Sequence, residues 1–202
     1  MARFANKVAL VLHPGTPIAD AVAAQLRQDG ATLVPVSANF DVASATAWEQ
    51  LLGELDRLDV LVTIAVAAYP SPQSIAATSL ADFRAVVRPN LEGAFLATRY
   101  ALLKMRAFGN GGVMVNVASA YATVGAADQA AMSASANGIR MMTKSAALAC
   151  AEANDRIRVN GVAAGPQATP EHIAKAVTFL ASDASSYVSG FTLPVDRGFL
   201  AK

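Results

Sequence analysis

Short apolar runs of strand length alternate with longer helix-forming segments along nearly the whole chain. The predicted strands are residues 7–12, 31–36, 60–64, 113–117, 158–163 and 192–195. The predicted helices are residues 18–29, 41–55, 80–106, 127–154 and 170–182. Strands separated by helices pair in parallel and carry the helices on the two faces of the sheet. The alternation therefore predicts the α/β class, with a doubly wound, mostly parallel sheet.

Composition indicates the size of the core and says little about partners. With 202 residues, of which 54% are hydrophobic and 15% charged, the chain can bury one sizeable core. We expect a single domain over residues 1–202. The formal net charge is +1, and no cluster of Lys and Arg stands out, so we expect no nucleic-acid partner.

The N-terminal residues and the apolar runs carry no targeting or membrane-spanning pattern. The chain enters its first strand directly, and its longest apolar runs are interrupted at strand length. We therefore expect a cytoplasmic protein with no membrane partner. Cys150 lies in an Ala-rich helix and is expected to be a buried apolar side chain. His13 and His172 have no ligand partners at suitable spacing, so we expect no metal site, and we expect His13 to face solvent from a turn.

Several segments resemble the short-chain dehydrogenase/reductase family in their order and spacing. They are Leu58-Asp59-Val60-Leu61-Val62, Asn90-Leu91-Glu92-Gly93, Asn116-Val117-Ala118-Ser119, Arg158-Val159-Asn160 and Phe179-Leu180-Ala181-Ser182-Asp183. The resemblance covers nearly the whole chain and implies a Rossmann-like sheet, a nicotinamide-dependent oxidoreductase and an oligomer. Two stretches are short relative to the family. One follows the second strand, and the other follows Gly165, where the family carries a lid over the substrate.

The turn after the first strand departs from the family's pattern. The family's Thr-Gly-x-x-x-Gly-x-Gly corresponds here to Leu12-His13-Pro14-Gly15-Thr16-Pro17-Ile18-Ala19. Such glycines let the backbone turn tightly and approach a pyrophosphate at the helix N-terminus. His13, Pro17 and Ala19 replace all three, and Pro17 also removes an amide donor. The cofactor-facing Asn-Asn-Ala-Gly of the family is replaced as well, by Thr63-Ile64-Ala65-Val66. We therefore predict that the chain holds no cofactor.

The catalytic pair that the resemblance implies is also replaced. In the family a Tyr exchanges a proton, and a Lys one helical turn later faces the same cofactor. Thirteen residues after Ser119 stands Met132, and four residues further stands Ala136, so neither position can exchange a proton. Ser119 and Asn90 keep the family's residue types and are the candidate catalytic residues. In the structural alternative, Ser119 caps a strand end and Asn90 braces a helix kink.

Three further residues, Asp41, Tyr69 and Tyr121, are candidates for a role near the site. Asp41 resembles an Asp of the family that contacts adenine, but the shortened chain before it favours a helix N-cap instead. Tyr69 lies in a predicted loop over the site, and Tyr121 follows Ser119 closely. Either hydroxyl could donate a hydrogen bond to an oxyanion.

These replacements lead to three hypotheses. The main one is a catalytically degenerate family member, a non-catalytic structural or regulatory subunit that forms a hetero-oligomer with an active relative or a homo-oligomer. The alternative is a cofactor-independent enzyme of the cyclase, isomerase or lyase type, which binds a small molecule in the emptied cleft. The third is an atypical NAD(P)-dependent oxidoreductase. Whether the chain is an enzyme stays open on the sequence, although we expect no functional NAD(P)-dependent dehydrogenase.

Overall fold

A computed structural model describes residues 2–13, 15–65 and 73–201, and in these ranges the chain forms one six-stranded sheet. The strands are β1 (Val8–Val11), β2 (Thr32–Leu33), β3 (Val60–Ile64), β4 (Gly112–Ser119), β5 (Ile157–Ala164) and β6 (Thr192–Val195). The helices are α1 (Pro17–Gln28), α2 (Ala45–Gly53), α3 (Leu80–Val87), α4 (Gly93–Phe108), α5 (Ala130–Ala153) and α6 (Pro170–Ala181). Shorter helical segments are the π-helical η1 (Arg88–Glu92) and the 3₁₀ turns η2 (Ala120–Ala122) and η3 (Asp183–Ser185).

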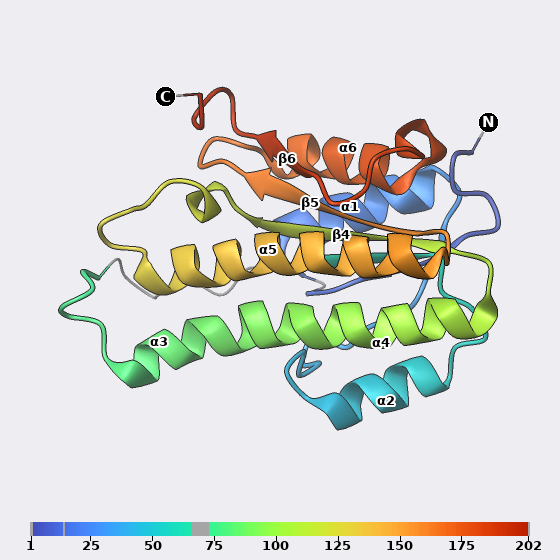
Figure 1. Cartoon of the computed structure of the whole chain (residues 1–202), viewed down its shortest axis with the longest axis horizontal. Coiled ribbons are helices and arrows are strands. Elements are labelled where there is room, and N and C mark those ends of the chain that lie inside the picture. Colours follow the sequence, from blue (N-terminus) through green and yellow to red (C-terminus); the bar gives the residue numbers. More distant parts are fainter. Residues whose placement is uncertain (1, 14, 66–72, 202) are drawn as a thin grey trace.

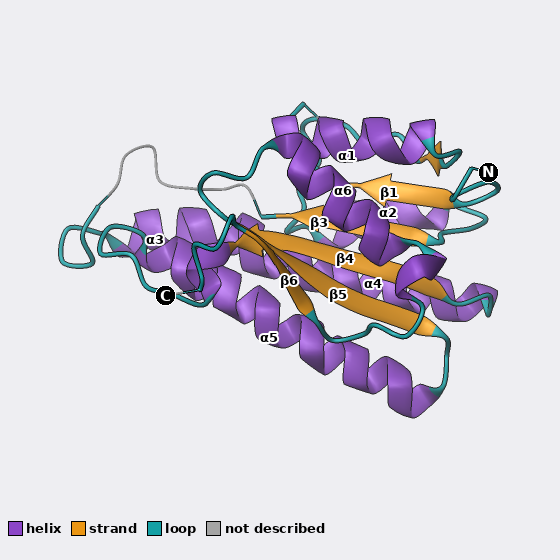
Figure 2. Ribbon diagram, turned by 90° about the horizontal axis from the view of Figure 1, so that it is seen from above, coloured by secondary structure: helices purple, strands orange, loops and turns teal. Residues whose placement is uncertain are grey.

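The sheet has the order β2-β1-β3-β4-β5-β6, and every neighbouring pair of strands is parallel. Helices α1 and α6 cover one face and helices α4 and α5 cover the other (Figures 1 and 2). Helix α2 packs on α4 (Figure 1). The predicted α/β fold with a doubly wound, mostly parallel sheet is confirmed. Strands β3 and β6 have the predicted bounds, whereas β2 is limited to two residues at the edge of the sheet.

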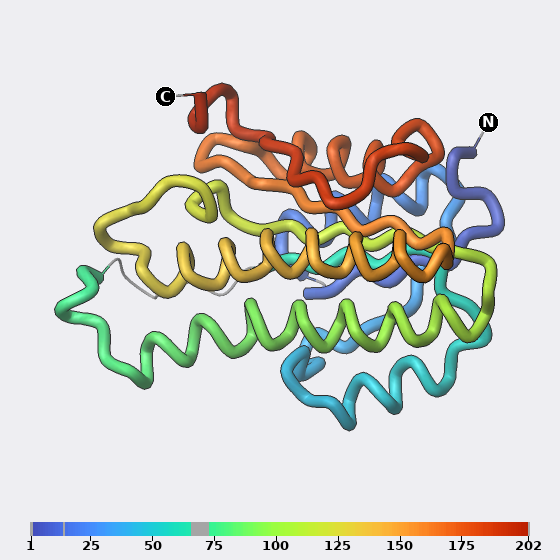
Figure 3. The backbone as a smooth tube through the Cα atoms, in the orientation of Figure 1, coloured from blue at the N-terminus to red at the C-terminus, as the bar shows by residue number. Residues whose placement is uncertain are grey.

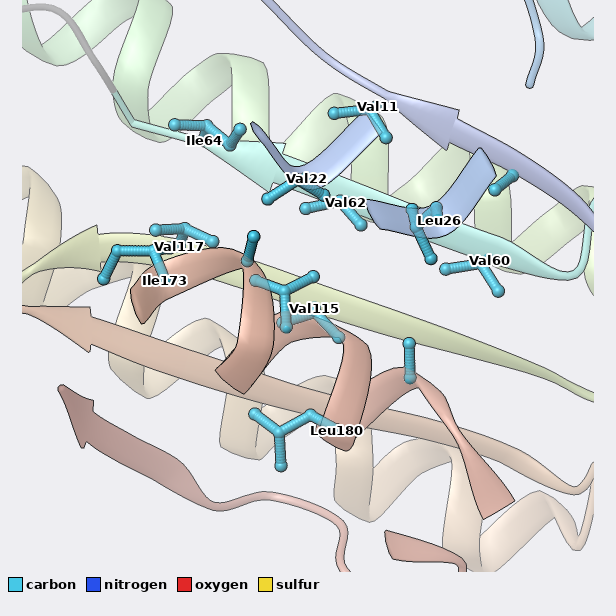
Figure 4. Close-up of a cluster of buried hydrophobic side chains, with 14 of the residues drawn as sticks. Val11, Val22, Leu26, Val60, Val62, Ile64, Val115, Val117, Ile173 and Leu180 are labelled. Atoms are coloured by element: carbon cyan, nitrogen blue, oxygen red, sulfur yellow. The ribbon is translucent and has the colours of Figure 1, made fainter. Parts of the chain in front are cut away.

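Apolar side chains on the two faces of the sheet form two buried cores. On one face, Val62 of β3, Val22 of α1 and Leu180 of α6 belong to the same core (Figure 4). On the other face, Trp48 of α2 and Met114 of β4 are fully buried members of the second core. Because the central strands are covered on both faces, their sequences are apolar without alternation.

A buried polar chain connects the two central strands to α5. Thr63 Oγ1 donates to Asn116 Oδ1 at 2.7 Å, and Asn116 Nδ2 donates to Thr143 Oγ1 at 2.9 Å. The Thr143 hydroxyl in turn donates to the Ile139 carbonyl at 2.8 Å. Each of the three polar side chains is therefore paired inside the molecule, which fixes α5 against β3 and β4.

The single helix predicted over residues 80–106 is interrupted in the structure. The π-helical turn η1 joins α3 to α4, and it contains Pro89, which has no amide hydrogen for an α-helical bond. Gly93 follows at a close approach, because a Cβ added there would lie 2.7 Å from Val42 Cγ2. The turn places Asn90, which is only 2% exposed, inside the molecule. Turns of this kind inside helices often occur at functional sites.

The predicted helix N-cap at Asp41 is wrong. Ser44 caps α2, and its Oγ accepts the Ala47 N–H at 3.3 Å. The Asp41 carboxylate closes the turn before the helix instead, where Oδ1 accepts the Ala43 N–H at 3.0 Å. Its Oδ2 pairs with Arg88 at 3.1 Å. Asp41 therefore ties the connection between β2 and α2 to the η1 turn.

The strands all begin at one edge of the sheet, here called the amino edge, and end at the other, the carboxyl edge. Figure 3 shows the N-terminal segment beside the amino edge and the C-terminal tail at the carboxyl edge. In open α/β sheets, ligands bind outside the carboxyl ends of the strands. In the described ranges, no helix combines the length and the apolar composition needed to cross a membrane.

Candidate active site

Ser119 is the last residue of β4 and lies half-buried at the carboxyl edge. Its Oγ accepts the Tyr121 N–H at 3.2 Å, which caps the η2 turn. Within the part of the chain that the structure describes, this is the only hydrogen bond of the Ser119 side chain. The hydroxyl hydrogen is therefore available to an acceptor, because a serine oxygen can accept and donate at once.

The two candidate catalytic residues, Ser119 and Asn90, lie in different gaps. Ser119 lines a gap with Ala136 and Arg140, and Asn90 lines another with His13. Each gap has a volume of about 10 Å³, close to the space that one water molecule needs. The structure therefore does not bring the two side chains together around a ligand-sized space.

The positions that correspond to the family's Tyr and Lys are occupied by packing residues. Met132 is half-buried on α5, and Ala136 is fully buried. Ala136 belongs to a small apolar cluster with Ala94, Ala118 and Ile139. The side of Ser119 that faces α5 is thus filled with apolar side chains and contains no proton-exchanging group from these two positions.

The turn between β1 and α1 does not fit a pyrophosphate. The Gly15 N–H donates to Asp20 Oδ1 at 2.9 Å, and the Thr16 N–H donates to the His13 carbonyl at 3.3 Å. Asp20 lies in the first turn of α1, so its carboxylate takes the place of an anion at the helix N-terminus. Pro17 supplies no donor. The described residues of this turn therefore do not fit the nicotinamide dinucleotide that the family resemblance implies.

His13 is half-buried, so the prediction that it faces solvent is wrong. Its backbone has a φ of 60°, which turns the chain sharply after β1 and directs it into α1. Burial lowers the pKa of the imidazole, because desolvation disfavours the charged ring. The ring is therefore neutral near pH 7, in the gap that Asn90 also lines.

The remaining predicted residues fall in several places. The Tyr121 ring packs edge-on against Phe199 of the C-terminal tail, with ring centroids 5.8 Å apart. Tyr69 lies outside the described residues. The buried position predicted for Cys150 is confirmed, since it is 1% exposed and burial raises the pKa of its thiol to about 11. His172 belongs to the capping box of α6, where its Nδ1 accepts the Thr169 N–H at 3.3 Å.

A wide cavity at the carboxyl edge, here called the α6 cavity, was not predicted. It has a volume of about 770 Å³ and lies between the start of α6 and the end of β6. Its charged and polar lining includes Thr169, His172, Lys175, Asp196 and Arg197. The sequence places charged residues after β6 and in the first turns of α6, but only the fold brings these two segments together.

Comparisons with known proteins agree with the motifs. A family model described as short chain dehydrogenase matches residues 3–176, and one described as Enoyl-(Acyl carrier protein) reductase matches residues 166–200. A cis-4-hydroxycyclohexanecarboxylate dehydrogenase of Sinomonas cyclohexanicum is 34% identical over 91% of this chain and 83% of the relative. A cyclopentanol dehydrogenase of Comamonas testosteroni is 33% identical over 81% of this chain and 76% of the relative. A crystal structure of a short chain dehydrogenase from Mycobacterium smegmatis has a TM-score of 0.86 and 26% identity, over 97% of this chain and 94% of that chain.

The prediction of a non-catalytic structural or regulatory subunit is wrong. Both family models describe oxidoreductases, and the two relatives named above, which align with most of the chain, are dehydrogenases by name. These matches point to a catalytic oxidoreductase. The prediction gave too much weight to Met132 and Ala136. These residues remove the family's Tyr/Lys proton transfer, but the Ser119 hydroxyl and the space at the carboxyl edge remain.

Proposed function

Because the chain belongs to the short-chain dehydrogenase/reductase family, we propose that it is an atypical NAD(P)-dependent oxidoreductase that interconverts a small secondary alcohol and its ketone. NAD(P)H would donate the hydride to the ketone, and it would have to bind without the family's glycine turn, because the Gly15 amide is bonded to Asp20. Two of its relatives are named for the oxidation of a hydroxyl group on a saturated ring. A small alicyclic alcohol or ketone is therefore the proposed substrate class. The reaction is placed at the carboxyl edge of the sheet, where parallel α/β folds bind ligands.

The Ser119 hydroxyl is the observation that carries this proposal. Its oxygen already accepts the Tyr121 N–H, so its position is fixed while its hydrogen stays available to donate to a ligand. When a ketone is reduced, negative charge grows on the carbonyl oxygen. A fixed donor at that oxygen stabilises the transition state more than the ground state. We therefore assign Ser119 to orienting the substrate oxygen and stabilising its charge.

Solvent water is the proposed source of the proton at the substrate oxygen. Met132 and Ala136 carry no exchangeable proton where the family has its acid and its activating Lys. The α6 cavity at the same edge opens to solvent, so water can approach the substrate. Without a positioned acid, turnover should be slower than in relatives, since general acid catalysis contributes about 10²–10⁴-fold.

The test is direct product detection with a matched serine control. The purified protein is incubated with cyclopentanone or cyclohexanone and either NADH or NADPH, and the alcohol is quantified by gas chromatography. We expect alcohol in proportion to the enzyme, and about 100-fold less with Ser119→Ala. Ser133→Ala should keep full activity, because it removes a buried hydroxyl that has no hydrogen-bond partner in the described structure. Absence of alcohol with both hydride donors would contradict the proposal.

A second candidate function is carbonyl chemistry without net oxidation, such as isomerisation or dehydration. It is favoured by the Gly15 N–H, which already donates to Asp20, so the described residues of the β1–α1 turn offer no phosphate cradle. The same Ser119 hydroxyl would then stabilise an enolate oxygen. In D₂O without added cofactor, NMR should show deuterium entering beside the ketone carbon of the substrate. Exchange no faster than in buffer would remove this candidate.

We also propose that the chain forms a single domain over residues 1–202, that it lies in the cytoplasm and that it associates with copies of itself. Phe95 and Leu103 on α4, and Met141 and Leu148 on α5, are each at least half exposed. Apolar side chains of this size on adjacent helices favour burial against a second copy of the chain. The comparisons give no support to a mixed oligomer with another family member. Sedimentation at several protein concentrations would test the homo-oligomer.

A further inference from the structure

We infer that the α6 cavity is a carboxylate-binding subsite, so that the substrate is a hydroxy acid or its oxo acid. This inference rests on the proposed function and adds the chemical class of the substrate. The cavity has a volume of about 770 Å³, within the range of pockets that bind small molecules. Lys175 and Arg197 provide its positive charges.

The register of the sheet places the α6 cavity beside Ser119. Ser119 of β4 is paired with Ala164 of β5, and Ala164 is paired with Val195 of β6. Neighbouring strands lie about 4.8 Å apart, so Val195 lies about 10 Å from Ser119 along one row of the carboxyl edge. Val195 lines the α6 cavity, and Arg197 follows it by two residues. A ring-sized substrate can therefore place its reacting oxygen near Ser119 and a second polar group toward the cavity.

The cations of the α6 cavity form no close ion pair with the described carboxylates. Lys175 and Arg197 are exposed, and within the described ranges neither lies within ion-pair distance of a carboxylate. Glu171 precedes Lys175 by four residues on α6, and its carboxylate interacts with Thr169, His172 and Lys175. Because Glu171 and Lys175 are both exposed, this attraction contributes little. The two positive charges are thus available to a ligand.

The acidic residue of the α6 cavity is committed to the fold. Asp196 Oδ1 accepts the Gly198 N–H at 3.0 Å, and its Oδ2 accepts the Leu200 N–H at 2.8 Å. Both oxygens therefore hold the C-terminal tail. The carboxylate keeps its negative charge, which the two positive charges of the α6 cavity outnumber. Helix α6 also begins at the cavity with Thr169 as its N-cap, so the positive end of its dipole faces the same space.

A carboxylate fits these donors better than a neutral group does. The guanidinium of Arg197 can bind both oxygens of a carboxylate, and the ammonium of Lys175 adds a point charge. His172 accepts the Thr169 N–H through Nδ1, which leaves its Nε2–H as a third donor toward the cavity. A neutral ring alcohol would leave all three donors to water.

The inference is tested by binding, independently of turnover. The probes are 4-oxocyclohexanecarboxylate and its neutral analogue cyclohexanone, titrated by calorimetry and NMR into the wild type, Lys175→Gln and Arg197→Asn. Asn is chosen because it tolerates the φ of 52° at position 197. Lys144→Gln is the matched control, since Lys144 is an exposed helical Lys away from the α6 cavity.

We expect saturable binding of the carboxylate that weakens about tenfold in each cavity variant and weakens with salt. The control variant and the affinity for cyclohexanone should not change. Carboxylate binding that is no tighter than cyclohexanone binding, or that is unchanged in both cavity variants, overturns the inference whatever the turnover. Charge-dependent binding without any ketone reduction would instead contradict the proposed redox reaction and leave the carboxylate subsite standing.

Discussion

The two halves of the carboxyl edge differ in the space that they leave for a ligand. On the β1–β3 side, the gap lined by His13 and Asn90 has a volume of about 10 Å³, and Asp20 accepts the Gly15 N–H of the adjoining turn. On the β5–β6 side, the α6 cavity has a volume of about 770 Å³ and two exposed cations, neither of which forms a close ion pair within the described ranges. The first half is filled by the chain's own side chains, whereas the second is open.

The difference indicates that the residues that bind a ligand lie on the open side of the edge, at the ends of β4, β5 and β6. Family membership would place a nucleotide on the filled side, where the described residues offer few donors. Ser119 lies between the two halves, at the end of β4, and keeps a hydroxyl hydrogen for an acceptor. Substitutions on each side should therefore have different consequences, for stability on the filled side and for binding or turnover on the open side.

The largest expected effect comes from placing a charge in the apolar cluster beside Ser119, between the two halves. Ala136→Lys would introduce an ammonium into the apolar cluster around Ala118 and Ile139. Because a buried Lys without a partner must be desolvated or neutralised, we expect a loss of about 4 kcal/mol in the free energy of unfolding. Urea denaturation measures it. Asn137→Lys, at the exposed neighbouring position, should change the midpoint little. Equal midpoints for the two variants would show that the space beside Ser119 is open.

The next effect separates activity from stability at Ser119. Ser119→Ala removes a donor to the substrate oxygen and one acceptor for the Tyr121 N–H. We expect kcat to fall about 100-fold while KM changes little, because the bond strengthens mainly in the transition state. The free energy of unfolding should fall by about 1 kcal/mol or less. A loss of activity that only follows a loss of folded protein in thermal melts would reduce Ser119 to a structural cap.

The sequence predicted the elements better than it predicted the site, for identifiable reasons. Strands β3 and β6 were predicted with their observed bounds, because short apolar runs flanked by turn residues mark strand ends. The η1 turn was missed because the apolar periodicity continues through Pro89. The bond from Gly15 to Asp20 depends on positive φ angles that side-chain types do not reveal. The α6 cavity combines segments near residues 170 and 196 that only the β5–β6 pairing brings together.

A smaller effect tests whether Asp20 blocks anion binding at the β1–α1 turn. Asp20→Ala frees the Gly15 amide and removes a negative charge from the first turn of α1. We expect the free energy of unfolding to fall by about 0.5–1 kcal/mol, because a first-turn carboxylate stabilises the helix. We also expect inorganic pyrophosphate to shift the NMR resonance of the Gly15 amide in the variant alone. Asp56→Ala, which removes an exposed carboxylate elsewhere, is the control. If pyrophosphate shifts the wild-type resonance equally, Asp20 does not block the turn.

The smallest expected effect is the pH dependence that His13 adds to the filled half. Burial lowers the pKa of its imidazole in the folded protein, so the unfolded chain binds more protons as the pH falls below the ordinary value of about 6.5. The stability gained by keeping the ring neutral is present above that pH and is lost as the pH falls through the folded pKa. His13→Asn removes this titration, and Asn tolerates the φ of 60° at this position. Melting temperatures between pH 7.5 and 5.5 should therefore fall less steeply in the variant than in the wild type. Equal slopes would mean that the His13 ring is solvated. The gap that it shares with Asn90 would then be open to water, and the β1–β3 side would not be filled as the comparison states.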